Sequence, residues 1–125
     1  MIRISELSFG NIVKIGDNIH RVVEIYGNKD MVRLNGREFT TYTVDLEPVP
    51  ITDEILDKNF ERKAHGWQLG DIWRIWSNPE SGYILATLVM DEFGGWSYEP
   101  CIPCAYLHGL QNTLKDLRID KMIVL

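Results

Sequence analysis

The residues best suited to chemistry stand close together near the end of the chain, between Glu99 and Asn112. This stretch contains the two cysteines, Cys101 and Cys104, in a C-x-x-C spacing, and His108 follows four residues after the second. A C-x-P-C sequence at the start of a helix resembles a redox motif, because the helix dipole there lowers the pKa of a thiol. The same three side chains are also potential zinc ligands.

Both of these chemistries need further parts that the sequence does not supply. A thioredoxin-like redox protein has a βαβ unit and more sheet after its cysteines, yet only ~20 residues follow Cys104. Structural zinc takes four ligands, and the other histidines, His20 and His65, lie far away in the sequence. We therefore predict no catalytic residues, no cofactor and no metal site. The weaker metal alternative consists of Cys101, Cys104 and His108.

The favoured interpretation of this stretch is structural. Buried cysteines pack as small apolar side chains, so we expect both thiols to pack at the start of a helix. We expect His108 to be a structural, hydrogen-bonded side chain on the flank of the apolar stripe of this helix, with Gln111 or Asn112 nearby.

A second group of residues offers stacking surfaces. All four tryptophans lie between positions 67 and 96, and Arg74 stands among them. Aromatic side chains on a sheet can stack against a ligand or a partner, but they also fill the cores of small domains. The candidate ligand or partner surface consists of Trp67, Trp73, Arg74, Trp76 and His108.

Short strands joined by tight turns are expected to position these residues. The first 47 residues alternate strand-like runs with turn sequences, including Asn35-Gly36, which is typical of a type I′ hairpin. Four or five short, twisted strands curl readily into a small barrel, so this part is predicted to be an SH3-like β-barrel. Residues 48–52 contain Pro48 and Pro50 and form a stiff connector.

Residues 53–125 are predicted to form an α+β unit. Thr52 is a suitable N-cap for a short helix that begins with Asp53 and Glu54. Strands are expected at 71–76, 83–90 and 96–99. Leucines at helical spacing predict an amphipathic helix over roughly 103–117, with Pro103 in its first turn. The predicted fold is therefore α+β, an SH3-like barrel followed by an antiparallel sheet covered by one helix. Packing of the two parts as one domain is an open alternative.

Three segments resemble a group of small proteins encoded by phages and mobile elements of gut bacteria. "DLEPVPITDE" (Asp45–Glu54) is similar to a D-[IL]-E-P-[IV]-P-[IL]-T-[DE]-E joint of that group, and "YLHGLQN" (Tyr106–Asn112) is similar to its Y-[VL]-H-x-L-Q-N helix. "FGNIV" (Phe9–Val13) is similar to its opening strand. The resemblance implies a shared fold and a phage or mobile-element origin, and it implies no activity. The C-x-x-C sequence is not part of this pattern.

Charge and hydropathy bear on location and partners. With 18 acidic and 13 basic residues, the formal net charge is −5, which disfavours non-specific binding to nucleic acid. No apolar run approaches the roughly 20 residues that span a bilayer, and the N-terminus lacks the apolar stretch of a signal peptide. We therefore expect a location in the host bacterial cytosol, with no membrane partner.

The leading hypothesis is a non-enzymatic binding or assembly protein that works through a strand edge or an aromatic patch, as a homo-oligomer or with a protein partner. An alternative is a nucleic-acid-associated module that uses Arg21, Arg33 and Arg37 of the SH3-like part. A third hypothesis is capture of a small nucleotide by Arg74 and the tryptophans, which would antagonise a host defence signal.

Overall fold

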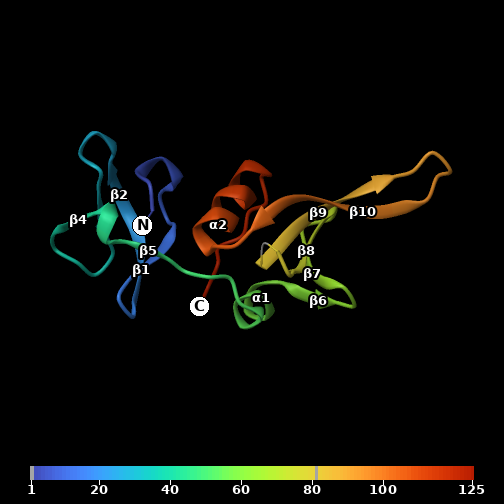
Figure 1. The fold of residues 1–125 in the computed structure, drawn as a ribbon, viewed down its shortest axis with the longest axis horizontal. Helices are drawn as coiled ribbons and strands as arrows, with labels where there is room; N and C mark the ends of the chain where they lie inside the picture. Colours follow the sequence, from blue (N-terminus) through green and yellow to red (C-terminus); the bar gives the residue numbers. More distant parts are fainter. Residues whose placement is uncertain (1, 81) are drawn as a thin grey trace. The chain divides into compact units, whose positions relative to one another are not determined.

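The computed structural model describes residues 2–80 and 82–125. Within these residues, ten strands form two antiparallel sheets of five strands each, accompanied by two α-helices (Figure 1). The predicted α+β class is confirmed.

The chain divides into two compact units, which are described separately. The first contains the residues up to Pro50 together with Tyr106–Leu117, and the second contains Ile51–Ala105 and Arg118–Leu125. The elements of the first unit are β1 (Ile12–Ile15), β2 (Asn18–Tyr26), β3 (Met31–Leu34), β4 (Thr40–Tyr42), β5 (Glu47–Pro48) and α2 (Leu107–Asp116). The elements of the second unit are α1 (Asp53–Asn59), β6 (Glu61–Lys63), β7 (Gly66–Leu69), β8 (Trp73–Asn78), β9 (Gly82–Met90) and β10 (Trp96–Cys104).

The first sheet is an open meander with the strand order β4-β3-β2-β1-β5. β4 and β5 are its edges and do not pair with each other among the described residues, so a closed SH3-like barrel is not observed. The predicted type I′ turn is also wrong. Gly36 has a φ of 77°, but Asn35 stays at negative φ and uses its side chain to accept a hydrogen bond from Arg21 N at 2.7 Å.

The core of the first unit is aliphatic. Its buried side chains come from the N-terminal segment and from all strands except the edges, with Leu46 added just before β5. The cluster comprises Ile2, Leu7, Val13, Val22, Val32, Leu34 and Leu46.

Helix α2 differs from the sequence expectation in its start and in its surroundings. It begins at Leu107 after an extended Tyr106, whereas Pro103 lies in β10 and pairs with Ile84. Proline is compatible with the edge of a sheet as well as with the first turn of a helix, and here Pro103 lies in the edge strand. The helix was expected over the second sheet, but it groups with the first unit.

Two amide side chains connect α2 to the start of β1. Gln111 accepts a hydrogen bond from Ile12 N at 2.7 Å and donates one to Gly10 O at 3.1 Å. Asn112 accepts from the Asn11 side chain at 2.9 Å and donates to Glu6 O at 2.7 Å. These bonds join residues about a hundred positions apart in the sequence, and they fix the helix beside the N-terminal segment.

The second sheet has the order β10-β9-β8-β7-β6 and is joined to helix α1. Thr52 caps this helix as predicted, because its side chain accepts a hydrogen bond from Ile55 N at 3.3 Å. Asn59, at the last position of α1, holds the C-terminal tail by two hydrogen bonds to the backbone of Val124, at 2.8 and 2.7 Å.

The hairpin of β9 and β10 is longer than the rest of its sheet. Each strand has nine residues, and the pairing of β9 with β8 ends at Thr87. Beyond this point Val89 and Met90 pair only with Ser97 and Trp96 of β10. The end of the hairpin is therefore a two-stranded ribbon that extends past the sheet (Figure 1), and we call residues 89–97 the arm.

Within the described residues, neither helix has the length and apolar character needed to cross a membrane.

Candidate functional site

The side chains of β8 alternate between two faces of the second sheet. Ile75 is fully buried and pairs with Trp67 and Leu85, so it marks the covered face. Arg74 and Trp76 point to the opposite, more open face, because successive strand residues point in opposite directions. The sheet therefore divides the predicted surface residues into two groups.

The covered face contains Trp67 and Trp73. Trp67 is only 3% exposed, and its indole nitrogen donates a hydrogen bond to the Asp57 side chain of α1 at 2.8 Å. Its ring also meets Tyr83 edge-on, with 6.2 Å between the ring centres. Trp73 is half-buried and pairs in register with Leu69. Trp67 therefore packs helix α1 onto the sheet, and its predicted place on a ligand surface is wrong.

The open face contains a hollow of about 480 Å³. Arg74 and Trp76 of β8 line it, together with Tyr98 of β10 and His65, which stands just before β7. Sequence reasoning found the first two residues and missed the other two. Tyr98 reaches the site through the pairing of β10 with β9 and of β9 with β8, and the sequence alone does not show that its ring lies against Arg74.

Arg74 is the central polar group of this hollow. Its guanidinium lies 4.4 Å from the centre of the Tyr98 ring, a cation–π contact that fixes its position. One terminal nitrogen donates to the side-chain oxygen of Gln68 at 3.3 Å. The Nε atom is buried and has no hydrogen-bond partner among the described residues.

Gly66 brings the chain close to the neighbouring strand at the rim of the hollow. It has a φ of 115°, and a Cβ atom there would stand 2.1 Å from the carbonyl oxygen of Ile75. Any other residue would force β7 away from β8, so glycine sets the path of the chain next to His65.

His108 belongs to α2 of the first unit and is buried. Its ring stacks on Tyr106 with 6.2 Å between centres, and burial lowers its pKa. The expected hydrogen bonds are not present, because Nδ1 has no partner within the described chain and the side chains of Gln111 and Asn112 turn to the N-terminal segment.

The two cysteines lie in β10 and not at the start of the helix. Cys104 is buried, and burial raises the pKa of its thiol to about 11, with a smaller contribution from Cys101. Cys101 is exposed, so only one of the two thiols packs as expected. A raised pKa is the opposite of what a redox thiol at a helix start requires.

The metal alternative gains no support. In the part of the chain that the structure describes, no group of three His, Cys, Asp or Glu side chains gathers in a way that could hold a metal ion.

The three arginines proposed for nucleic acid differ in how far their charge is compensated. Arg33 forms an ion pair with Glu24 at 2.5 Å, and hydrogen bonds from Tyr26 and Arg33 lower the pKa of that carboxyl. Arg21 donates to Gly10 O at 3.4 Å, and Arg37 is exposed in the loop after β3. These arginines stay a hypothesis for a nucleic-acid surface.

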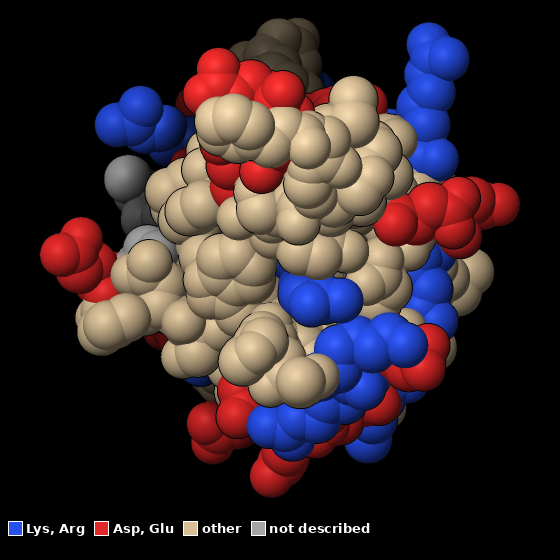
Figure 2. Space-filling view, turned by 90° about the vertical axis from the view of Figure 1, so that its right-hand side faces the viewer, with Lys and Arg blue, Asp and Glu red and all other residues tan. Residues whose placement is uncertain are grey.

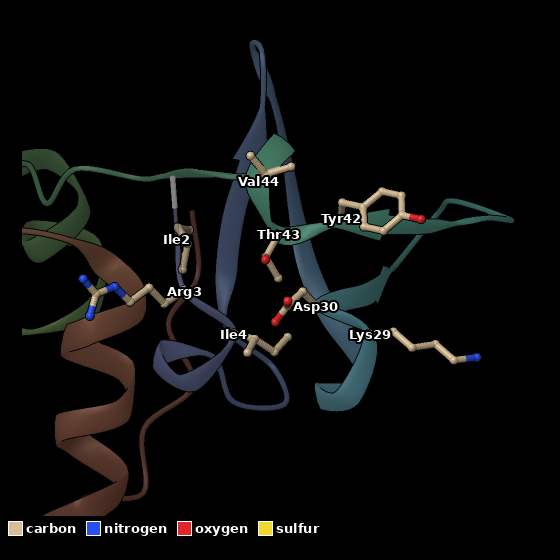
Figure 3. Close-up of a pocket in the computed structure, with 8 residues that line it drawn as sticks. All are labelled: Ile2, Arg3, Ile4, Lys29, Asp30, Tyr42, Thr43 and Val44. Carbon is tan, nitrogen blue, oxygen red and sulfur yellow. The ribbon is translucent and has the colours of Figure 1, made fainter.

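A second hollow of about 440 Å³ lies in the first unit, between the N-terminal segment and β4 (Figure 3). Ile4, Asp30 and Thr43 line its centre, while the side chains of Lys29 and Tyr42 point away from it (Figure 3). Asp30 has a φ of 51°, and its backbone carbonyl accepts a hydrogen bond from Thr43 N at 2.9 Å, which continues the pairing of β3 with β4.

The arm ends in exposed apolar side chains. Met90 and Trp96 form a cross-strand pair and are 60% and 64% exposed, and Phe93 in the turn is 90% exposed. Seen from the end to which the hairpin points, uncharged surface fills the middle of the face and basic side chains gather below it (Figure 2). Exposed apolar clusters of this kind mark contact surfaces.

Comparison of the chain with protein families, curated proteins and solved structures finds no match. The geometry itself shows how the three segments of the mobile-element resemblance relate. Gly10 and Asn11 of the first segment bond to Gln111 and Asn112 of the last, and Val49 O of the middle segment accepts from Leu107 N at 2.8 Å. Parts of all three segments thus meet within the first unit.

Proposed function

We propose that this chain is a non-enzymatic binding and assembly module that associates with a second copy of itself through the arm. The observation that carries the proposal is the exposure of Met90, Phe93 and Trp96 on a ribbon that the rest of the sheet does not support. An isolated two-stranded ribbon is at best marginally stable in water, so a partner that covers it would stabilise it.

The edge of the arm favours a second copy as that partner. The outer edge of β10 offers backbone groups for pairing, but Pro100 and Pro103 lack an N–H near its base. A strand of a partner would therefore pair with the backbone of Trp96–Glu99. A two-fold, antiparallel pairing of this segment would bring the Trp96 faces together and place the acidic tips, with Asp91 and Glu92, at opposite ends.

Two further parts of the proposal rest on the sequence. The resemblance supports a phage or mobile-element origin, with action in the host cytosol. The strand order of the first sheet, the bend at the bulge after Val22 and the 3₁₀ turn of Thr43–Asp45 before β5 support an open, SH3-like meander as its architecture.

The oligomeric state tests the proposal. Sedimentation velocity of the full chain over a wide concentration range should show a mass that rises towards a dimer, and Met90→Ser with Trp96→Ser should lower the association constant at least ~10-fold. Phe39→Ser is the matched control, because Phe39 is 77% exposed but lies in a loop of the first unit. A monomer at all concentrations, or equal association of the double variant, would contradict the proposal.

A further inference from the structure

We propose that the hollow on the open face of the second sheet binds a small anion that carries a planar ring. This inference goes beyond the assembly role and does not depend on it. It rests on the state of Arg74 and on the side chains around it.

Arg74 is a half-buried cation without a compensating charge. The ion pairs within the described residues join Lys14 to Glu47, Arg33 to Glu24, Arg62 to Asp57 and Lys63 to Glu61, and Arg74 has none. A partly desolvated guanidinium without a counter-charge is stabilised when an oxyanion approaches it.

The guanidinium is also held in place before any ligand arrives. Tyr98 lies against one face of it and Gln68 accepts from one terminal nitrogen, while Nε stays unpaired among the described groups. Ala86, the β9 residue in register with Arg74, is small and buried, so the position directly opposite Arg74 carries no tall side chain. A guanidinium held in a fixed position suits a carboxylate or a phosphate.

The remaining walls favour a flat ring. Trp76 lies on the same face as Arg74, two residues further along β8, and lines the hollow with a half-buried indole. His65 stands at the exposed rim and supplies another planar, polar group. The volume of about 480 Å³ falls within the range of small-ligand sites, roughly 300–1,000 Å³. The shared chemistry is an oxyanion joined to an aromatic ring, as in a nucleoside monophosphate or an aromatic carboxylate.

The Arg74 Nε–H resonance of the full-length, ¹⁵N-labelled protein gives a direct readout. It is followed during titration with adenosine monophosphate, indole carboxylate, adenosine and inorganic phosphate. We expect at least one of the two ringed anions to shift it saturably, and adenosine and phosphate to bind at least ~10-fold more weakly. The responses to the two ringed anions separate a nucleotide from an aromatic carboxylate as the source.

Variants test the residues. Arg74→Gln and Trp76→Leu should each weaken binding at least ~10-fold, measured by calorimetry. Arg62→Gln should leave it unchanged, because Arg62 lies on the same sheet but is paired with Asp57. The wild-type titration keeps the test decisive if a variant fails to fold. No saturable shift with either ringed anion, or an equal response to adenosine or phosphate alone, would overturn the proposal.

Discussion

The thiols of Cys101 and Cys104 stand three positions apart in β10 but lie in different surroundings. Cys101 is exposed, with its sulfur 3.5 Å from Leu85 O, whereas Cys104 is buried. The thiolate is the reactive form, so a thiol whose pKa is raised to about 11 is almost wholly protonated and unreactive at neutral pH. Burial also shields Cys104 from a reagent in solution.

We therefore predict that one thiol of the folded protein reacts with a maleimide near pH 7.5 and that the second reacts only on unfolding. Cys101→Ser should abolish labelling of the folded protein, and Cys104→Ser should leave it unchanged. Mass spectrometry with and without denaturant measures both. Equal labelling rates of the two thiols in the folded state would show that Cys104 is not protected.

At the scale of elements, α2 is attached to β1 by side-chain amides. Gln111 satisfies both Ile12 N and Gly10 O, and Ile12 is fully buried. Removal of this side chain leaves backbone groups without partners in a place that water reaches poorly, and such groups cost about 1–3 kcal/mol each.

Gln111→Ala is thus expected to lower the free energy of unfolding by about 1–3 kcal/mol, measured by denaturant titration. Lys115→Ala, at an exposed position of the same helix, should change it by less than about 0.5 kcal/mol. Similar values for the two variants would mean that the amide bonds do not hold the helix to the strand.

At the scale of the whole molecule, the first unit is discontinuous in the sequence. It needs Tyr106–Leu117, which follows all strands of the second unit. Pro50 and Tyr106 form an antiparallel bridge, so the two segments of the first unit meet where the chain leaves and re-enters it. A short linker could replace the intervening residues.

A fragment that ends at Pro50 is expected to be unfolded, because it loses α2 and the bonds of Gln111 and Asn112. The same fragment joined through a short glycine linker to residues 106–117 should fold, with a dispersed amide spectrum in NMR. A fusion with the helical residues in scrambled order is the control. A folded fragment without the helix would show that α2 is dispensable for the first unit.

Local rules predicted much of the secondary structure. The strand expected at 83–90 placed β9 closely, and Thr52 before two acidic residues marked the start of α1. These features depend on neighbours in the sequence, through the run of apolar residues in a central strand and through side-chain capping of the backbone.

Local rules failed where the same residue is compatible with two different structures. Pro103 fits a helix start and an edge strand equally well, and the pairing of β10 with β9 decided for the strand. Tryptophans are suited both to a hydrophobic core and to a binding surface. Trp67 is buried in the core because its indole nitrogen bonds to Asp57 of α1.

The sequence by itself thus determined the α+β class, most strands and the cap of α1, because each depends on short-range geometry. Only the tertiary structure decided that α2 joins the first unit and that His65 and Tyr98 meet Arg74 and Trp76. The physical reason is that these contacts join residues far apart along the chain, and the energy of packing and of long-range hydrogen bonds selects them from many arrangements that local preferences allow equally.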